Sequence, residues 1–570
     1  MTHPAPASIW SRLRHPDGQT VRKWLTWHPT DLDRCIQERA NHRPEPLDSR
    51  ERDELRQAHQ HWHADEQTLR LIEALGDERA RVVVAGQQPS LLAGPLLVIY
   101  KAIGAIKLAR RLKQRHPDLL WVPVFWVASE DHDFDELRRV FWPTPTGQLQ
   151  EFRIPSQHHE PGRMVGRLET QPLAESLIRQ IDESTQRTEF TPGLHRYLGE
   201  VYCEGQTLES SFARLMLRLF AGSGLVLVTP RMEWVIRRSA PTFAAELDHP
   251  GRSTQVLLER ADQLSAEGLE PTLHRPPNSL NLFWVDEEGR RYTLRHTEGE
   301  IQRSLPGRSD AQQIDQPPVT PAILRSMLAE DPGVFSANVV TRALIQDAIL
   351  PTAAQIVGPG EAGYLAQVEA VYPRFGVFAP VRYPRPEALL IEPRIQRQLE
   401  KYHVDLDMAI RRDSTRLAEL VLSRTQKNED VTRVEEARQR HKDEIQRILD
   451  QTQARSPAID GAFDKLRQML EKGYETIIDR LLYHHREDQQ HLNRAMALIN
   501  NCLMPGEQSQ ERRLNPIVPF ANRYGLDWVL RLMPLIDVDF RTGRQDLYLR
   551  QIAGEVKGAP EQAQSGDPLP

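Results

Sequence analysis

A dense acidic cluster directly follows the apolar run at 120–127, and its residue types could carry chemistry. Positions 130–136 hold five acids and one histidine, including Asp131, His132 and Asp133. Carboxylates at this density could bind a divalent cation or a cationic amine, and a histidine that titrates near neutral pH could act as a general base. The alternative is a helix start, because an aspartate cap followed by acids in the first turn stabilises a helix N-terminus.

A second candidate is the loop GQQPSLLAGP at 86–95, which lies between an apolar strand and an apolar helix. Loops at the carboxyl end of a parallel strand line the ligand crevice of an open α/β sheet, and the helix start offers free N–H groups to an anion. Gln87, Gln88 and Gly94 are therefore candidate binding residues. No Gly-Lys-Ser/Thr follows, so the loop is not a P-loop, and a purely structural turn is the alternative.

A third candidate is the turn GPGEAGY at 358–364, with Asn338 and Arg342 upstream. Gly358 and Gly360 begin a G-x-G-x-x-G match, but Glu361 would repel a pyrophosphate, so a dinucleotide site is not expected. Glu361 on a tight turn could instead hold a cationic amine. Arg342 could make a bidentate contact with a carboxylate, and a surface salt bridge is its alternative.

The elements that must position these residues follow an alternating pattern. A strand at 81–85, a long apolar helix and a strand at 120–127 predict a βαβ unit with a parallel sheet, and a helix at 207–220 leads into a strand at 225–228. The first eighty residues read mainly as polar helix. The segments 141–200 and 264–320 read as insertions, and the second contains a predicted β-hairpin at 282–294. The fold class is therefore α/β, with a parallel-sheet core and inserted connecting segments.

From about 395 to 500 the sequence changes to helical heptads interrupted at Ser456 and Pro457. This pattern predicts a long antiparallel coiled-coil arm, with an ordinary helical bundle as the alternative. The expected organisation is a core at 1–394, an arm at 395–500, a segment at 501–555 that returns to the core, and a flexible tail at 556–570. The apolar seam positions are Val434, Ala437, His441, Ile445, Ile448, Ile459, Phe463, Leu466, Leu470, Tyr474, Ile477, Leu481, Leu492, Met496 and Ile499.

Composition excludes several classes of protein. The chain of 570 residues has 73 Lys and Arg against 79 Asp and Glu, so a nucleic-acid partner or a polybasic membrane contact is not expected. Three distant cysteines, Cys35, Cys203 and Cys502, exclude a disulfide scaffold and a cysteine-rich zinc module. No apolar N-terminal segment or membrane-length apolar run occurs, so a cytoplasmic location is expected.

Five separated blocks resemble a known family. AGQQPSLLAGPLLVIYKAIGAIKLA, VPVFWVASEDHDFDEL, FSANVVTRALIQDAILP, GPGEAGYLAQV and PGEQSQERRLNPIVPF occur in the order of the bacillithiol biosynthesis cysteine-adding enzyme (cysteine ligase) family, over about residues 80–550. The resemblance implies a Rossmann-like core, similar to class I aminoacyl-tRNA synthetases and nucleotidylyltransferases, and a coiled-coil arm used in dimerisation. The chain departs from synthetases near Gly94, where it lacks both histidines of a His-x-Gly-His signature.

The resemblance also implies an activity. The family joins the carboxyl of L-cysteine to the amine of glucosaminyl-malate, the last step of bacillithiol synthesis, and activation by ATP as an acyl-adenylate or acyl-phosphate is expected. A metal requirement stays open. Two other readings remain: a nucleotidyltransferase-like enzyme with another carboxylate and amine, and a non-catalytic coiled-coil dimer that scaffolds other enzymes.

Combined with the residue types, the resemblance suggests roles for the candidate residues. Substrate or phosphate would lie on Gln87, Gln88 and the helix start at Gly94. The amine or a metal would lie on Asp131, His132 and Asp133, with His132 as the base. A malate carboxylate would bind Asn338 and Arg342. A cationic amine would bind Glu361, which the turn at Gly358 and Gly360 presents.

Overall fold

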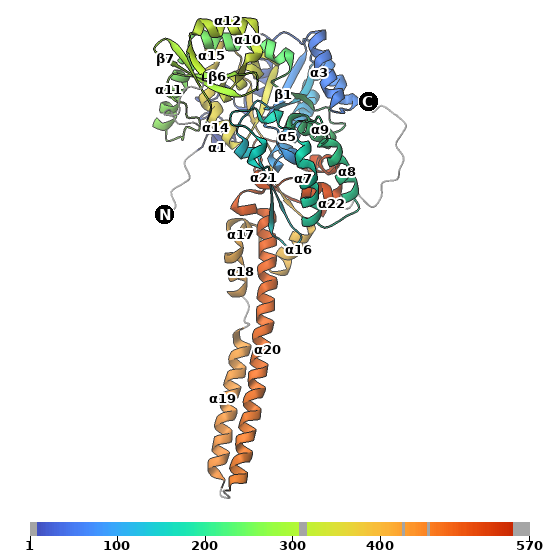
Figure 1. Cartoon of the computed structure of the whole chain (residues 1–570), viewed down its shortest axis with the longest axis vertical. Helices are drawn as coiled ribbons and strands as arrows, with labels where there is room; N and C mark the ends of the chain where they lie inside the picture. The colour runs from blue at the N-terminus through green and yellow to red at the C-terminus, as the bar shows by residue number, and fades with distance from the viewer. Residues whose placement is uncertain (1–7, 307–315, 424–427, 453–455, 551–570) are drawn as a thin grey trace. The chain divides into compact units, whose positions relative to one another are not determined.

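The computed structural model of this protein describes residues 8–306, 316–423, 428–452 and 456–550 (Figure 1). The chain forms two compact units, one of residues 1–142, 150–390 and 510–570, the other of residues 143–149 and 391–509. The expected arm, 395–500, lies within the second unit, whereas the expected returning segment, 501–555, is divided between the two units. The expected tail, 556–570, lies outside the described residues.

The first unit contains a five-stranded parallel sheet in the order β12-β11-β1-β2-β5. Its strands are β1 (Ala80–Gln87), β2 (Leu120–Val127), β5 (Val226–Val228), β11 (Thr352–Val357) and β12 (Val381–Pro384). The chain builds outward from β1 in one direction through β2 and β5, and then from β1 in the other direction through β11 and β12. The order therefore reverses between β1 and β11, which is the switch point where open α/β sheets bind ligands. The expected Rossmann-like α/β core is confirmed.

Burial on both faces explains why these segments form central strands. Seven of the eight residues of β1 and seven of the eight of β2 are buried. The helix between them, α5 (Leu96–Arg115), packs against β1, β2 and β11 with a broad apolar face. An alternating pattern would have predicted a half-exposed sheet, whereas these continuous apolar runs require cover on both sides.

The N-terminal polar segment forms separate helices, not one continuous helix. Asp48 caps α3 (Ser49–His61) through a capping box with Glu51, and Asp65 caps α4 (Glu66–Ala74). His63, at φ 62°, turns the chain between the two helices. Residues 48–75 contain no Pro or Gly, yet these two capping aspartates divide them into two helices.

A second, antiparallel sheet carries the predicted hairpin, which is confirmed. Its order is β10-β6-β7-β8-β9, and β6 pairs with β7 through Phe283 opposite Thr293 and Val285 opposite Arg291. Its strands are β6 (Ser279–Val285), β7 (Arg291–Thr297), β8 (Glu300–Ser304), β9 (Gln316–Val319) and β10 (Phe335–Ala337).

Further helices and short strands complete the first unit. They are α1 (Ile9–Leu13), α2 (Leu32–Arg39), α6 (Phe134–Leu137), β3 (Arg139–Pro143), β4 (Leu149–Arg153), α7 (Gln171–Ser184), α8 (Thr191–Val201), α9 (Leu208–Leu219), α10 (Glu233–Asp248), α11 (Arg252–Ala266), α12 (Pro321–Glu330), α13 (Val339–Ile349), α14 (Pro359–Val368), α15 (Tyr372–Phe375), β13 (Glu387–Ile391), α21 (Gln510–Arg513), α22 (Asn522–Tyr524), α23 (Trp528–Leu532) and β14 (Arg544–Tyr548), with β3, β4 and β13 extending to residues of the second unit.

The second unit consists of α16 (Pro393–Lys401), α17 (Leu406–Arg411), α18 (Ser414–Ser423), α19 (Asn428–Gln451) and α20 (Pro457–Leu503). α19 and α20 run antiparallel, since Arg438 pairs with Glu471 while Gln446, further along α19, bonds to Arg467, which comes earlier on α20 (Figure 1). Ser456 caps α20 at the predicted break. The antiparallel coiled-coil hairpin is confirmed.

The apolar seam of this hairpin is narrower than the heptads suggest. Ile445 is 6% exposed, but Ile448, Leu466 and Ile477 are 45%, 44% and 48% exposed. Two helices alone bury one stripe each, so heptad positions beside that stripe remain open to solvent.

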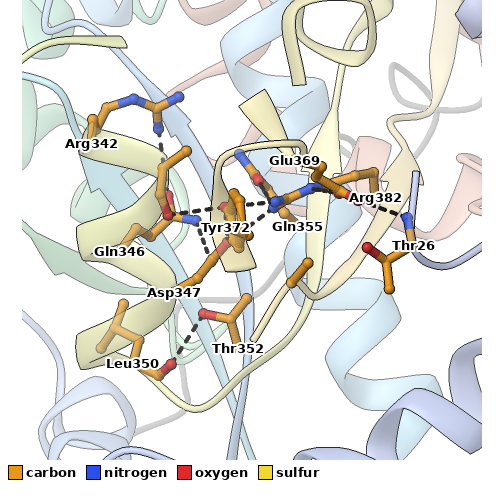
Figure 2. Close-up of polar contacts among 12 residues, drawn as sticks. Thr26, Arg342, Gln346, Asp347, Leu350, Thr352, Gln355, Glu369, Tyr372 and Arg382 are labelled. Carbon is orange, nitrogen blue, oxygen red and sulfur yellow. Dashed lines mark hydrogen bonds and ion pairs between the residues drawn. The ribbon is translucent and has the colours of Figure 1, made fainter. Parts of the chain in front are cut away.

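A buried ionic network ties β11 and β12 to the helices beside them (Figure 2). Arg382 on β12 lies 3.1 Å from Asp347 and 2.8 Å from Glu369, and the guanidinium and both carboxylates are almost completely buried. The Tyr372 hydroxyl bonds to Asp347 at 2.7 Å, and the backbone N–H of Thr26 donates to Glu369 at 2.7 Å. One guanidinium thus compensates two buried carboxylates.

We expect Arg382→Met to lower the free energy of unfolding of the first unit by roughly 3–5 kcal/mol, because two buried carboxylates lose their counter-ion. Denaturant unfolding followed by tryptophan fluorescence measures this unit alone, since all 10 tryptophans lie in it. The control is Arg187→Met, at an exposed pair with Asp182, where solvent screens the charges and the stability of the unit should be almost unchanged. Equal effects of the two substitutions would contradict the structural role of the network.

Candidate functional site

A cavity of about 380 Å³ lies in the first unit, where the carboxyl ends of β1 and β2 approach the second sheet. Gly86 and Gln87 reach it from the end of β1, and Glu361 reaches it from the first turn of α14, just after β11. The cavity thus includes the switch point between β1 and β11. Phe283 of β6 and Phe335 of β10 form part of its apolar wall.

A buried lysine joins the two strand ends at this switch point. Lys101 of α5 donates to the Gly86 carbonyl at 2.7 Å and to Gln87 Oε1 at 2.8 Å, and its Nζ lies 2.7 Å from Glu361 Oε2. An ammonium group has three donors and no acceptor, so these contacts use it completely. Burial lowers the pKa of Lys101, although the Glu361 carboxylate opposes the shift.

The lysine also sets the direction of a chain of side-chain hydrogen bonds. Because Lys101 can only donate, Gln87 turns its oxygen toward it, and Gln87 Nε2 then donates to Gln88 Oε1 at 2.8 Å. Gln88 Nε2 donates in turn to Asp131 Oδ2 at 2.8 Å. The two glutamines, which line the cavity, therefore connect the pair of Lys101 and Glu361 to the acidic segment after β2.

Neighbouring acids in that segment have opposite pKa shifts. Burial raises the pKa of Glu130, and this effect outweighs the charges of Arg231 and Arg291, which lower it. Burial also opposes ionisation of Asp131, but the Arg291 charge and the Gln88 hydrogen bond outweigh it and lower the pKa of Asp131. Both residues line the cavity, so it holds one carboxylate that stays ionised and one that binds a proton more readily.

His132 lies against the second sheet. Its Nδ1 is 3.0 Å from Nη1 of Arg291 on β7, and its ring meets the Phe283 ring edge-on at 5.3 Å between centroids. Burial and the Arg291 charge lower the pKa of His132 to about 4. The imidazole is therefore neutral near pH 7.

Asn338 and Arg342 both line the cavity, as expected for a binding pair. Asn338 also caps α13, because its Oδ1 accepts from the N–H groups of Val340 and Thr341 at 2.9 and 3.1 Å. Arg342, one turn later, donates to the Tyr364 hydroxyl at 2.7 Å. Asn338 is thus partly committed to the helix start, whereas Arg342 presents a fixed guanidinium.

Four predicted site residues lie outside the cavity lining. The helix start at Gly94 is covered, because the Leu96 N–H donates to Leu514 and Asn515 donates to the Gly94 carbonyl. Gly94, at φ 72°, serves the turn itself. Its expected contact with substrate or phosphate is therefore not supported by its position.

The other three residues lie at the N-termini of helices. Asp133 caps α6 by accepting from the Glu136 N–H at 3.2 Å, which matches the helix-start alternative for the acidic cluster. The Gly358 N–H donates to Glu361 at 3.0 Å, and Gly360 is exposed on α14. Gly358 and Gly360 thus form the turn that presents Glu361 and do not line the cavity themselves.

Sequence reasoning missed Lys101, Arg291 and Tyr364. Lys101 had a signal, since it is a lone charge inside the apolar run LLVIYKAIGAI. A charge within such a run costs free energy unless it is paired, which indicates a buried partner. Arg291 and Tyr364 reach the cavity only through the packing of the second sheet and α14, and no local pattern marks them.

Within the residues that the structure describes, no group of three or more His, Cys, Asp or Glu side chains is arranged to hold a metal ion. In the same part of the chain, no helix is long and apolar enough to cross a membrane.

The fold and the site define an α/β protein with a Rossmann-like core, a cavity at the switch point of its sheet, and a coiled-coil unit. Residues 23–386 match the family described as "Bacillithiol biosynthesis BshC, N-terminal Rossmann-like domain", and residues 388–539 match "Bacillithiol biosynthesis BshC, C-terminal coiled-coil domain". The chain belongs to the bacillithiol biosynthesis BshC family.

Curated relatives are similar in sequence to this chain over most of their length. A protein of Desulforamulus reducens is 29% identical over 83% of this chain and 85% of its own. One of Koribacter versatilis is 32% identical over 79% of this chain and 81% of its own, and one of Geobacillus sp. (strain WCH70) is 31% identical over 84% and 87%. Each of the three is named "Putative cysteine ligase BshC".

Proposed function

We propose that this chain is the ligase that joins the carboxyl of L-cysteine to the amine of glucosaminyl-malate, the final step of bacillithiol synthesis. Membership of the BshC family and the name of its relatives support a cysteine ligase. The observation that carries the proposal is a single cavity that combines the Arg342 guanidinium with the carboxylates Asp131 and Glu361. Its volume of about 380 Å³ falls in the range of small-molecule sites.

In this proposal the charged groups of the two substrates bind cavity side chains of opposite charge. Arg342 takes a carboxylate of the malate arm, since its planar guanidinium can hold both carboxylate oxygens. Asp131 keeps a negative charge at neutral pH and takes a cationic amine. Glu361 already pairs with Lys101, so in this proposal it acts on an incoming amine only together with that lysine.

Amide formation from a free carboxylate is uphill in water, so we propose ATP as the cosubstrate. The cysteine carboxylate attacks the α-phosphorus of ATP to form an acyl-adenylate and pyrophosphate, or the γ-phosphorus to form an acyl-phosphate and ADP. The neutral amine of glucosaminyl-malate then attacks the acyl carbon, the C–N bond replaces the bond to AMP or phosphate, and the amine proton passes to water. Gly94 lies outside the cavity lining and the Leu96 N–H at its helix start already donates to Leu514, so the cavity arginines are the anion contacts that support this step.

The direct test incubates the purified chain with cysteine, glucosaminyl-malate and ATP, and analyses the products by mass spectrometry. We expect the amide, accompanied by stoichiometric AMP or ADP, and the nucleotide identifies the intermediate. Absence of amide from correctly folded protein would contradict the proposal.

The same assay locates the reaction. Arg342→Lys should raise the KM for glucosaminyl-malate roughly tenfold with little change in kcat, because a lysine cannot make the bidentate contact. The control is Arg325→Lys, at an exposed pair with Asp248 outside the cavity. Equal KM values for the two variants would place the malate carboxylate elsewhere.

We further propose that the chain forms a homodimer through its helical hairpin. The apolar side chains that α19 and α20 leave exposed, Ile448, Leu466, Met469 and Ile477, support this arrangement. Light scattering should give twice the mass of 65.5 kDa for the chain, and Leu466→Glu with Met469→Glu should shift it toward one copy. A single-copy mass for the unaltered chain would contradict the dimer.

A further inference from the structure

The contact between Arg291 and His132 restricts what the histidine can do. A guanidinium carries only N–H donors and stays protonated, so the Nδ1 that lies 3.0 Å from Arg291 must accept the hydrogen bond. A ring nitrogen that accepts has no proton. The neutral imidazole then carries its single proton on Nε2.

Arg291 is itself held in place. Its Nε donates to Ser336 Oγ at 3.0 Å, its Nη2 donates to the Ala337 carbonyl, and its guanidinium carbon lies 3.8 Å from the centre of the Phe283 ring. The residue is 3% exposed. All three guanidinium nitrogens are hydrogen-bonded and the group lies against the Phe283 ring, so these contacts keep Arg291 beside Nδ1 of His132.

The charged groups around His132 favour the neutral ring. Asp131 Oδ1, 3.9 Å from Nδ1, would stabilise an imidazolium, whereas Arg291 and His159 oppose it. Burial also opposes the charge, and together with Arg291 it outweighs Asp131, lowering the pKa to about 4.

The nitrogen that faces a ligand is therefore Nε2. His132 lines the cavity, its side chain is 23% exposed, and Nε2 has no hydrogen-bond partner among the described residues. Although Nε2 makes no hydrogen bond in the described part of the chain, it is not fully buried, so an incoming group can reach it.

We infer that Arg291 is a positioning residue that holds His132 as the neutral, Nε2-protonated tautomer, and that His132 donates from Nε2 to a negatively charged oxygen of the substrate. The first half concerns this chain alone, and the second half rests on the proposed function. His132 then stabilises developing charge and does not remove a proton, since its one lone pair is bound to Arg291. This differs from the base role that the sequence suggested.

Nuclear magnetic resonance of protein labelled at the histidine ring nitrogens tests the tautomer without any activity. The His132 signal is identified by its loss in His132→Gln. We expect the Nε2–H pattern, unchanged between pH 8 and pH 5.5. A signal with Nδ1–H, or one that titrates near pH 6.5, would overturn the inference.

Two variants of Arg291 test its positioning role. Arg291→Lys keeps a group that only donates and should preserve the Nε2–H pattern. Arg291→Met removes the donor and should move the His132 titration midpoint upward by at least one pH unit, with both tautomers populated. Identical His132 spectra in Arg291→Met and the unaltered chain would show that Arg291 only packs.

Kinetics of the ligation separate a donor from a base. His132→Gln places an amide N–H near the position of Nε2, whereas His132→Asn places its amide near Nδ1. Loss of one preorganised donor costs roughly 100- to 1000-fold in kcat, so we expect that loss for Asn and a loss of less than about tenfold for Gln. Equal losses would overturn the donor role, and an inactive unaltered chain would refute the proposed function while the resonance result still decides the tautomer.

Discussion

The buried ammonium group of Lys101 is the constraint on which the cavity depends. It lies where the sheet order reverses, and its three donors bind the Gly86 carbonyl, the Gln87 side chain and the Glu361 carboxylate. A group that only donates fixes the orientation of every acceptor it meets, and the two glutamines pass that orientation on to Asp131. The strand ends, the first turn of α14 and the acidic segment are thus linked through one side chain.

Arg291 has the corresponding role on the side of the second sheet. It orders His132 as Lys101 orders the glutamines, so the polar groups of the cavity are arranged between two buried cations. Such preorganised dipoles need little rearrangement when charge develops on a substrate. The antiparallel sheet inserted into the Rossmann-like core therefore contributes directly to the site, because it supplies Arg291 and Phe283.

The sequence predicted the parts of this architecture that depend on local patterns. Continuous apolar runs marked β1 and β2, the hairpin at β6 and β7 followed from its turn, and heptads marked α19 and α20. Of the site, Gln87 and Gln88 were predicted because a loop at the carboxyl end of a parallel strand lines the crevice of an open sheet, whereas Asp131 was predicted from the acidic cluster and Glu361 from its tight turn. Arg291 could not be predicted, because its position follows from how the second sheet packs. Gly94 was misplaced because the segment near Leu514, distant in sequence, covers its helix start.

A double-mutant cycle on Lys101 and Glu361 tests the central constraint most directly. The free energies of unfolding of Lys101→Met, Glu361→Gln and the double variant are measured by tryptophan fluorescence in denaturant. Glu361→Gln leaves the buried Lys101 charge, and Lys101→Met the partly buried Glu361 charge, without its partner, so we predict a coupling of about 2 kcal/mol or more, with the double variant less destabilised than the sum of the singles. Effects that add to within about 0.5 kcal/mol would contradict the account.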